Sequence, residues 1–481
     1  MSRNRVVVLA TAVVLCLTAS AQREGKQASR PLPEGNAKTI LETACTSCHA
    51  ITMITSTGHT REDWQLVMER MVSAGAEVPP DQIAMVTDYL AKNFPEGNVA
   101  KAVIIPGPVK VSFKEWTVPT RGSRPHDPLA AHDGYLWYTG QYANVLGRVD
   151  TRSGNIQEFR PTTPRSGPHG LVEDRDGNIW FTGNFKGYIG KLDPKTEKVT
   201  EYKLPAEARD PHTPLFDRKG ILWFTVQGAN KVGRLNPQTG EIKVVDSPTE
   251  RSLPYGMVID SKGTPYYCEF GAPKIASIDP NTMAVHEWTL PNPDSRPRRI
   301  AITNDDLIYY ADYSRGYLGR LDPKTGAVKD WPSPGGPTSQ PYGITFLNGV
   351  IWYSESAVKP NTLVRFDPKT EKFQTWVIPA GGGVVRNMMA TRDGNLVIAE
   401  SALNKLRGVD RKITLRGRRP RSSRAGEGAQ AAFPDTTDAG VEAGPRQVGA
   451  PRSGRSIRSR SASNPIPGTL ELQSQICCWW C

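Results

Sequence analysis

The sequence predicts a multidomain protein in which a small all-α domain precedes an all-β propeller of seven blades. Two observations carry this prediction. One is a cysteine motif near the N-terminus that is followed by short helical segments, and the other is a repeat with a period of 43 to 45 residues in the middle of the chain. With 481 residues, the chain is long enough for two or three domains that have cores of their own.

Residues 1–21 have the parts of an export signal peptide. Arg3 and Arg5 form a basic region, residues 6–17 are apolar, and a small-residue cleavage site ends at Ala21. The mature protein is therefore expected in the periplasm or secreted. No later run approaches about 20 apolar residues, so no integral membrane segment is expected after cleavage. Cys16 lacks the small residue before it that a lipoprotein signal would show, which leaves a lipid anchor as the minor alternative.

The motif Cys45-Thr46-Ser47-Cys48-His49 has the spacing at which a c-type haem is attached. Two thiols form thioether bonds to the haem vinyl groups, and the histidine directly after them binds the iron. Zinc binding or dithiol chemistry is the alternative for a CxxC pair. Zinc would need a second such pair or a Cys/His pair at ligand spacing, and the sequence offers neither. We therefore predict one covalent haem c bound by Cys45, Cys48 and His49.

Residues 33–98 are expected to form the haem domain. Helices are predicted over residues 37–45, 60–73 and 80–94, and Thr60 is the expected N-cap of the second because acidic residues follow in its first turn. Three helices this short bury little apolar surface by themselves. The haem is expected to supply the missing core.

This segment resembles a compact class I cytochrome c, in which a distal methionine precedes the last helix. Trp64, then Met71, then Tyr89-Leu90 follow that order. The resemblance implies Met71 as the iron ligand opposite His49, with Met68 as the first alternative. The other side chains considered as ligands are Met53, Met85 and His59. A thioether ligand raises the reduction potential, which suits electron transfer with a redox partner protein.

A dipeptide that mostly begins with proline recurs through the middle of the chain. Its second residues are His126, His169, His212, Tyr255, Arg298 and Tyr342, and Asn387 continues the series. After each dipeptide come an apolar strand, a turn with glycine, and further strands, as in residues 179–182 and 188–192. Four strands at this period are typical of a propeller blade, so seven units predict seven blades.

The last repeat, residues 386–410, contains only three strands. Residues 110–118 (KVSFKEWTV) are similar to residues 198–204 (KVTEYKL), the outer strand of another blade. We therefore expect the two ends of the domain to complete the seventh blade together. The propeller is then predicted over residues 109–410, after a linker at residues 99–108.

Residues 411–481 are rich in Arg, Ser, Gly and Pro and lack apolar periodicity, so they are predicted to be a disordered basic tail. A C-terminus read out of frame is the other explanation for this composition. The tail carries about +7 of the formal net charge of +12. The remainder of the chain is close to an ordinary globular surface without a polybasic helix, so no nucleic-acid partner is expected.

Residues 166–170 (SGPHG), 179–182 (IWFT) and 189–192 (IGKL) resemble the virginiamycin B lyase (streptogramin lyase) family, and the likeness extends over the whole propeller but not the haem domain. Members of that family open the lactone of a cyclic depsipeptide by elimination, with a magnesium ion. The resemblance implies a small-molecule substrate. It also implies catalytic roles for His169 and for Asp210 and His212 of the triplet Asp210-Pro211-His212.

The family's acidic metal ligand would fall near Val226 and Gln227, and neither is a carboxylate. Acidic residues occupy the equivalent position of four later blades, and Glu269 is the first candidate to replace the missing ligand. These acids are Glu269, Asp312, Glu355 and Glu400. The repeat thus predicts histidines on one arc of the ring and carboxylates on the opposite arc. The alternatives are turn histidines bonded to backbone groups, and acids that are solvated or paired with Arg298 or Arg299.

Two classes of function follow. In the first, the propeller acts on a small molecule as a lyase or binding domain, and the haem transfers single electrons as an accessory. In the second, the protein is a redox protein whose propeller is a non-catalytic binding or docking module. A third possibility combines the two classes: the propeller oxidises a bound molecule and passes electrons to the haem. Elimination needs no electrons, so a fused haem domain favours redox work.

Overall fold

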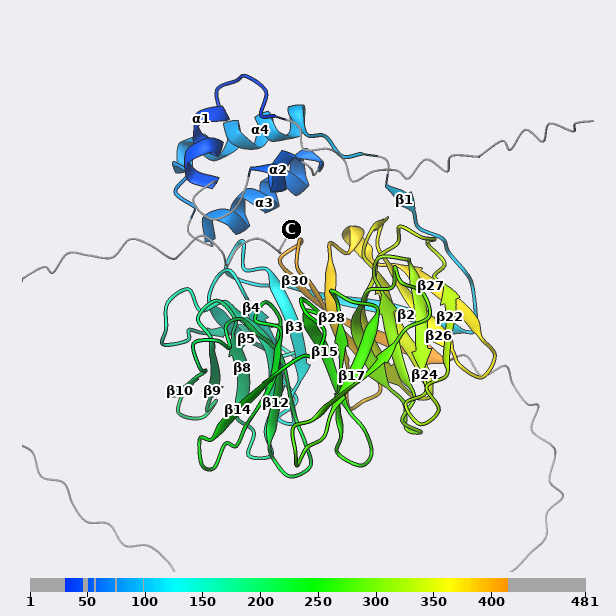
Figure 1. Ribbon diagram of the computed structural model, residues 1–481. Helices are drawn as coiled ribbons and strands as arrows, with labels where there is room; N and C mark the ends of the chain where they lie inside the picture. Colours follow the sequence, from blue (N-terminus) through cyan, green and yellow to red (C-terminus); the bar gives the residue numbers. More distant parts are fainter. Residues whose placement is uncertain (1–30, 46–50, 56–57, 74–75, 98, 414–481) are drawn as a thin grey trace, which may run out of the picture. The chain divides into compact units, whose positions relative to one another are not determined.

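The computed structural model describes residues 31–45, 51–55, 58–73, 76–97 and 99–413. Most of these residues form seven four-stranded antiparallel sheets arranged around a ring (Figure 1). The predicted seven-bladed propeller is therefore confirmed. The predicted signal peptide, residues 46–49 of the CxxCH motif, and the predicted tail from residue 414 lie outside the described residues.

The N-terminal segment contains short helices. They are α1 (Lys38–Ile40), a π-helical turn (Leu41–Cys45), α2 (Thr52–Thr55), α3 (Arg61–Ser73), a 3-10 turn (Pro80–Gln82) and α4 (Ile83–Asn93). The Asp63 amide donates to Thr60 Oγ1 at 3.1 Å, which confirms the predicted N-cap. The first and last predicted helices differ from the expectation, because each contains a turn that is not α-helical. In the described part of the chain, no helix is long and apolar enough to cross a membrane.

A buried tryptophan connects the two longer helices. The Trp64 indole N–H donates to the Phe94 carbonyl at 2.9 Å, which links α3 to the residue that follows α4. Leu41, Met68 and Leu90 pack around it in one apolar cluster. The helical segment thus has a small core among its described residues.

The blades are numbered here in chain order. Blade 1 has β3 (Pro125–Ala130), β4 (Leu136–Gly140), β5 (Val145–Val149) and β6 (Ile156–Phe159). Blade 2 has β7 (Pro168–Glu173), β8 (Ile179–Gly183), β9 (Tyr188–Leu192) and β10 (Val199–Lys203). Blade 3 has β11 (Pro211–Phe216), β12 (Leu222–Val226), β13 (Lys231–Leu235) and β14 (Ile242–Asp246). Blade 4 has β15 (Pro254–Ile259), β16 (Pro265–Glu269), β17 (Lys274–Ile278) and β18 (Val285–Thr289).

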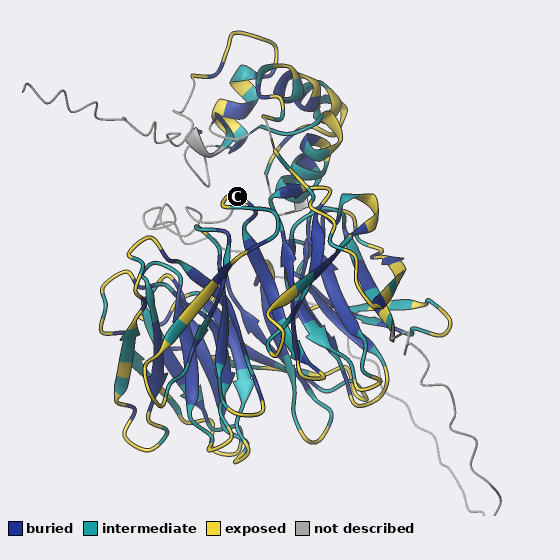
Figure 2. Cartoon of the chain, turned by 90° about the vertical axis from the view of Figure 1, so that its right-hand side faces the viewer, coloured by how far each residue is buried: buried dark blue, intermediate teal, exposed yellow. Residues whose placement is uncertain are grey.

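The last three blades follow the same plan. Blade 5 has β19 (Pro297–Ile302), β20 (Ile308–Asp312), β21 (Tyr317–Leu321) and β22 (Val328–Pro332). Blade 6 has β23 (Pro341–Leu347), β24 (Val350–Glu355), β26 (Thr362–Asp367) and β27 (Lys372–Val377). Blade 7 has β28 (Val385–Ala390), β29 (Leu396–Glu400), β30 (Lys405–Ile413) and β2 (Val109–Thr117). The inner strands are mostly buried, and exposed residues concentrate on outer strands and loops (Figure 2).

Local sequence explains the blade. The second strand is buried on both faces, as in β8, so it reads as a continuous apolar run. In the third strand Gly190 leaves room for the Phe181 ring, whose atoms would lie 2.2 Å from an added Cβ. The turn to the fourth strand begins with Asp193, whose carboxylate accepts the Lys195 amide at 2.9 Å. These requirements account for the repeated pattern of the sequence.

The seventh blade is completed by both ends of the domain, as expected. β2 pairs with β30 in antiparallel register from Val109 and Ile413 to Thr117 and Lys405. β30 runs three residues beyond the predicted end at Asp410, because its pairing with β2 continues that far. The Glu115 carboxylate binds both Lys405 and Arg407 across this pair.

The linker before β2 is fixed to blade 6. β1 (Ala100–Lys101) pairs in parallel with β25 (Val358–Lys359). The Thr375 amide donates to the Ile105 carbonyl at 3.0 Å, and Gln374 Nε2 donates to the Val109 carbonyl at 2.7 Å. The predicted linker is therefore an ordered segment that leads β2 into its place.

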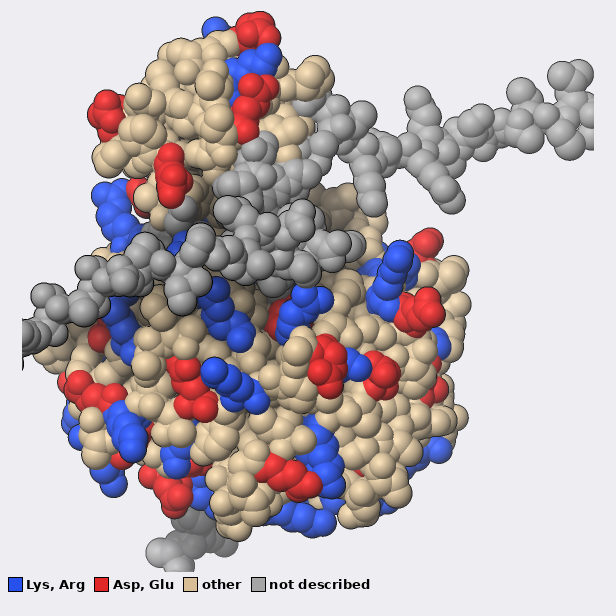
Figure 3. Space-filling view, turned by 60° about the vertical axis from the view of Figure 1, so that its left-hand side comes forward, with Lys and Arg blue, Asp and Glu red and all other residues tan. Residues whose placement is uncertain are grey.

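The described surface of the propeller mixes charges of both signs. On the face shown in Figure 3, Lys and Arg side chains are interspersed with Asp and Glu, without a broad area of one sign. The concentration of one charge described below lies inside the ring.

We predict that β2 is needed to close the ring. Of two chains that differ only in β2, residues 109–413 should fold, whereas residues 118–413 should melt roughly 10 °C lower or aggregate, because Trp116 is lost from the core and the edge of β30 is exposed. Thermal melts and size-exclusion chromatography measure the difference. Equal melting temperatures for the two chains would contradict this role of β2.

Candidate functional site

A bulge near the start of every inner strand directs one side chain of each blade to the ring axis. In β3 the pairing with β4 shifts between Pro125 and Pro128, and the six other inner strands shift at the same point. The residue after the first of each inner strand is the axial one. The axial residues are His126, His169, His212, Tyr255, Arg298, Tyr342 and Arg386.

The seventh axial residue corrects the sequence analysis. Val385 pairs with Glu400 as Pro341 pairs with Glu355, so Arg386 and not Asn387 is equivalent to His126. The prediction was wrong by one residue because the last repeat has valine where the others have proline. Without that proline, the sequence did not show which residue of the last repeat is the axial one.

Buried hydroxyl groups hold the histidine backbone in place. Thr139 Oγ1 accepts the Asp127 amide at 3.0 Å and donates to the His169 carbonyl of the next blade at 2.7 Å. Thr182 and Thr225 repeat this arrangement, donating to the carbonyls of His212 and Tyr255 at 3.0 and 2.8 Å. Each hydroxyl therefore satisfies a bulge amide and fixes the neighbouring axial residue.

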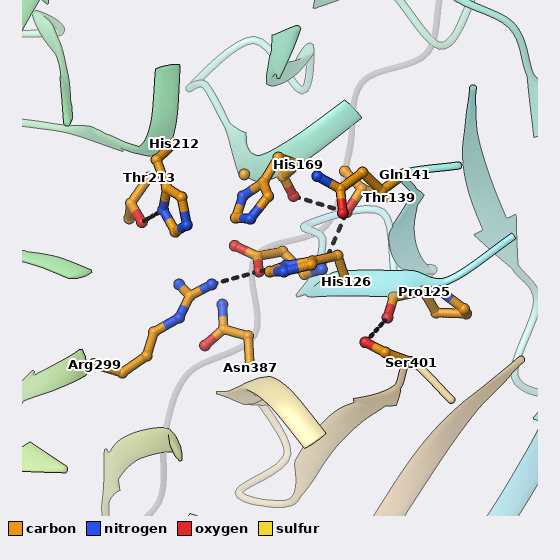
Figure 4. Close-up of polar contacts among 12 residues, drawn as sticks. Pro125, His126, Thr139, Gln141, His169, His212, Thr213, Arg299, Asn387 and Ser401 are labelled. Carbon is orange, nitrogen blue, oxygen red and sulfur yellow. Dashed lines mark hydrogen bonds and ion pairs between the residues drawn. The ribbon is translucent and has the colours of Figure 1, made fainter. Parts of the chain in front are cut away.

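The three histidines form a contiguous stack. The ring centroids of His126 and His169 are 3.7 Å apart, and those of His169 and His212 are 3.9 Å apart. Figure 4 shows the three rings projecting from neighbouring strands toward a common space with Arg299 and Asn387. All three are fully buried. Burial, together with neighbouring cationic and imidazole groups, lowers the pKa of each histidine well below 6.5, so the imidazoles are neutral at neutral pH.

An ion pair crosses the axis from blade 5 to blade 1. Arg299 Nη2 donates to Asp127 Oδ1 at 2.8 Å, and the same oxygen lies 2.9 Å from His126 Nδ1. His212 Nδ1 lies 2.9 Å from Thr213 Oγ1. These contacts at Nδ1 fix the orientation of the His126 and His212 rings.

Tyrosine and arginine occupy the opposite arc. The Arg298 guanidinium lies 4.0 Å from the Tyr342 ring centroid and 4.3 Å from that of Tyr313. The Tyr255 and Tyr342 hydroxyl groups are 2.5 Å apart. Burial alone would raise the pKa of Tyr342, but Arg298, Arg386 and Arg299 together outweigh burial and lower this pKa to about 8.

Of the residues predicted to be catalytic, the structure brings two together. His169 and His212 are neighbours in the stack, whereas both Asp210 carboxylate oxygens accept the Gly228 amide, at 2.8 and 2.9 Å. Burial raises the pKa of Asp210 to about 7. The roles of these three residues in catalysis stay predictions.

The four later acids lie in blades 4 to 7, on the arc of the ring opposite the histidines, and each bonds to groups other than the axial residues. Glu269 accepts the Ser247 hydroxyl at 2.9 Å, and Glu400 binds Arg407 Nε at 2.5 Å. Glu355 and Asp312 likewise bond to groups of their own blades or of the loops just before them. The alternative in which these acids pair with Arg298 or Arg299 was wrong, because their partners lie on the third strands of their blades and in loops.

The residues present do not fit the magnesium site that the resemblance implied. Val226 offers no ligand atom, the Asp210 oxygens are bonded to Gly228, and burial raises the pKa of Glu269 to about 8, which keeps this carboxyl protonated at neutral pH. The described group closest to a metal site is His126, Asp127 and His169, whose ligand atoms lie within 4.8 Å of one another. Arg299 already binds that carboxylate, so its charge opposes a cation there.

The predicted haem ligands are described only in part. Cys45 is buried, Met68 is buried in the helical core, and Met71 is half-buried on α3. Cys45, Met68 and Met71 border one cavity together with Trp64 and Leu90. Cys48 and His49 lie outside the described residues.

Sequence reasoning missed Asp127 and Arg386 as members of the site, and it named Arg299 only as a possible partner of the later acids. The sequence did contain a pattern that could have identified two of them, because Asp127 and Arg299 each directly follow an axial residue of the repeat. The bulge places two successive residues near the axis, and simple alternation along a strand does not predict this. His126 was recognised only as part of the repeat.

The fold and the axial cluster define a seven-bladed β-propeller with a polar site on its axis. The model of the virginiamycin B lyase family matches residues 96–357, more than half of the chain, and the protein belongs to this family.

Solved structures agree with that assignment. A streptogramin B lyase structure is 26% identical with a TM-score of 0.58, and the match covers 63% of this chain and 98% of the other. Virginiamycin B lyase from Staphylococcus aureus is 22% identical with a TM-score of 0.57, covering 62% and 99%. Its catalytically inactive histidine-to-alanine variant with quinupristin is 21% identical, with a TM-score of 0.58 and the same coverage. No curated protein matches the chain.

We predict that the Glu269→Gln variant loses a pH dependence of stability. The raised pKa of Glu269 means that the unfolded carboxyl ionises near pH 4.5 and the folded one only near pH 8, so its contribution to stability falls as pH rises between these values. Glutamine does not titrate and still accepts the Ser247 hydroxyl.

The variant should therefore match the wild type near pH 4.5 and be more stable at pH 9, by about 1.4 kcal/mol for each unit of the pKa difference. Urea unfolding across this range measures it, with the exposed Glu207→Gln as control. Parallel pH profiles for wild type and Glu269→Gln would contradict the buried, protonated carboxyl.

Proposed function

We propose that this protein is an exported haem c protein whose propeller acts on a small molecule at the axial cluster by abstracting a proton next to a carbonyl group. The observation that carries this proposal is the stack of three buried, neutral imidazoles on the axis of a virginiamycin B lyase family propeller. A neutral imidazole is an effective general base, and burial keeps it in this form.

This chain's own residues can supply the base and the positive charge that the elimination needs. The His212 imidazole takes the proton α to the carbonyl, the electron pair of the C–H bond forms the C=C bond, and the C–O bond breaks to release a carboxylate. Arg299 and Arg298 supply positive charge for the enolate and the leaving carboxylate, the part that a metal ion would otherwise play. Because burial holds the pKa of His212 well below 6.5, the base form is present at neutral pH.

The haem part of the proposal rests on the CxxCH motif. Cys45 and Cys48 would hold the haem covalently, and His49 and Met71 would bind its iron. When bound, the group would transfer single electrons to a redox partner. In support, Cys45 and Met71 border the same cavity, although they are 26 positions apart in the sequence.

We predict that the mature protein keeps its haem after denaturation and extraction with acidified acetone, because thioether bonds survive both. The Cys48→Ser variant should retain little covalent haem, and the single-cysteine control Cys268→Ser should retain all of it. A pyridine haemochrome spectrum measures the amount. Free extraction of haem from the wild type would reject the cytochrome assignment.

We predict that elimination on a cyclic depsipeptide lactone is slow in the wild type and unaffected by chelator, because the residues do not fit a magnesium site. His212→Ala should reduce the rate by about two to four orders of magnitude, the usual share of general base catalysis. The exposed His286→Ala is the matched control and should leave the rate unchanged.

Loss of turnover with chelator would show that a metal site exists after all. Reduction of the ferric haem by a bound molecule, without elimination product, would instead favour the alternative in which the propeller serves a redox function.

A further inference from the structure

The axial cluster holds an excess of buried positive charge. Three guanidinium groups, those of Arg298, Arg299 and Arg386, are at most 8% exposed. Among the described residues, Asp127 is the one carboxylate with an ion pair to any of them, and it binds Arg299. Buried charges in proteins are normally paired with an opposite charge. This site is therefore built with more cationic than anionic groups.

Arg386 is the clearest case. It occupies the axial position of blade 7, where blades 1 to 3 have histidine, and is 8% exposed. Its Nε has no hydrogen-bond partner in the described part of the protein. Among the described residues, the aromatic ring near it is that of Tyr342, whose centroid lies 6.0 Å from the guanidinium carbon of Arg386.

Arg298 is positioned by aromatic rings rather than by an acid. Tyr342, Tyr313 and Phe270 lie 4.0, 4.3 and 4.6 Å from its guanidinium carbon. Its Nε also lacks a hydrogen-bond partner among the described atoms. Ring faces hold the cation in place without neutralising it. The Nε donors of Arg298 and Arg386 are thus available for an anion.

Arg407, another buried arginine of the same propeller, is paired with carboxylates in the usual way. Arg407 is 2% exposed, and it binds Glu400 through Nε and Nη2 and Glu115 through Nη2. Both partners are carboxylates supplied by its own blade. Arg386 has no such partner among the described residues, so the fold does not explain its charge.

We propose that the axial site binds a small, doubly charged oxyanion, a dicarboxylate or a phosphate ester, through Arg386 and Arg298. Guanidinium groups bind carboxylate and phosphate oxygens through paired N–H donors. The Asp127–Arg299 pair and the neutral histidines complete the site. This inference rests on the proposed function in that it names the substrate class of the same axial site.

The charge of the site also separates this ligand from the neutral carbonyl groups of a depsipeptide. A ligand with two negative charges would balance Arg298 and Arg386, which have no carboxylate partner among the described residues. Held there, it would lie beside the histidine stack, since Arg298 and Arg386 both contribute to the lowered pKa of His126 and Arg298 also to that of His212. The base and the anion-binding groups would then meet on one substrate.

Isothermal titration calorimetry of the full mature chain tests the proposal with malonate, inorganic phosphate and the neutral dimethyl malonate. The wild type should bind malonate or phosphate and not the diester. Tighter malonate binding would identify a dicarboxylate ligand, and tighter phosphate binding a phosphate ester. The Arg386→Met variant should weaken this binding by about 10- to 150-fold.

The ligand-free proteins provide the second measurement. Arg386→Met should melt at the wild-type temperature or higher, because it removes an unbalanced buried charge, whereas the matched Arg407→Met should melt lower. No binding of either anion up to 50 mM, or equal affinity in Arg386→Met, would overturn the proposal. So would a loss of stability in Arg386→Met as large as that in Arg407→Met. Binding does not depend on turnover, so a failed elimination assay with Arg386-dependent binding would reject only the proposed reaction.

Discussion

The axial site depends on the buried hydroxyl that links each of the first three blades to the next. Thr139, Thr182 and Thr225 each accept an amide of their own bulge and donate to the carbonyl of the following axial residue. In blade 4 the Cys268 thiol takes the same place, with both contacts at 3.2 Å. The bulges would otherwise bury unsatisfied amides, so one short polar side chain stabilises the fold and orients the site together.

The axis of this propeller is rich in arginine. The hydrophobic Val226 stands where an acidic ligand is expected from the family resemblance, and the acids of the later blades bond to groups behind the axis. Arginines occupy positions 298, 299 and 386 instead. These arginine side chains place positive charge in the ring, and their geometry is fixed by packing against aromatic rings and by the ion pair with Asp127.

The sequence was sufficient for the architecture because the blade has strict local requirements. Gly190 beneath Phe181 and the carboxylate turn at Asp193 recur with the period of the repeat, so the blades and their number could be predicted. The site was less predictable. The pairing of Asp127 with Arg299 joins residues 172 positions apart, in blades 1 and 5. Such a contact arises from closure of the ring and leaves no local pattern.

The pairing of β2 with β30 also sets the order in which the ring can be completed. β2 is the first propeller strand to leave the ribosome and, in an exported chain, the first to cross the membrane, whereas its partner is the last. Every other blade pairs only with its own consecutive strands and can form as it emerges. The inner strands of blades 1 and 7 can meet only when synthesis of the propeller is nearly finished. Until then the axial histidines and arginines are spread along an open arc, so the site is assembled only when the last blade has formed.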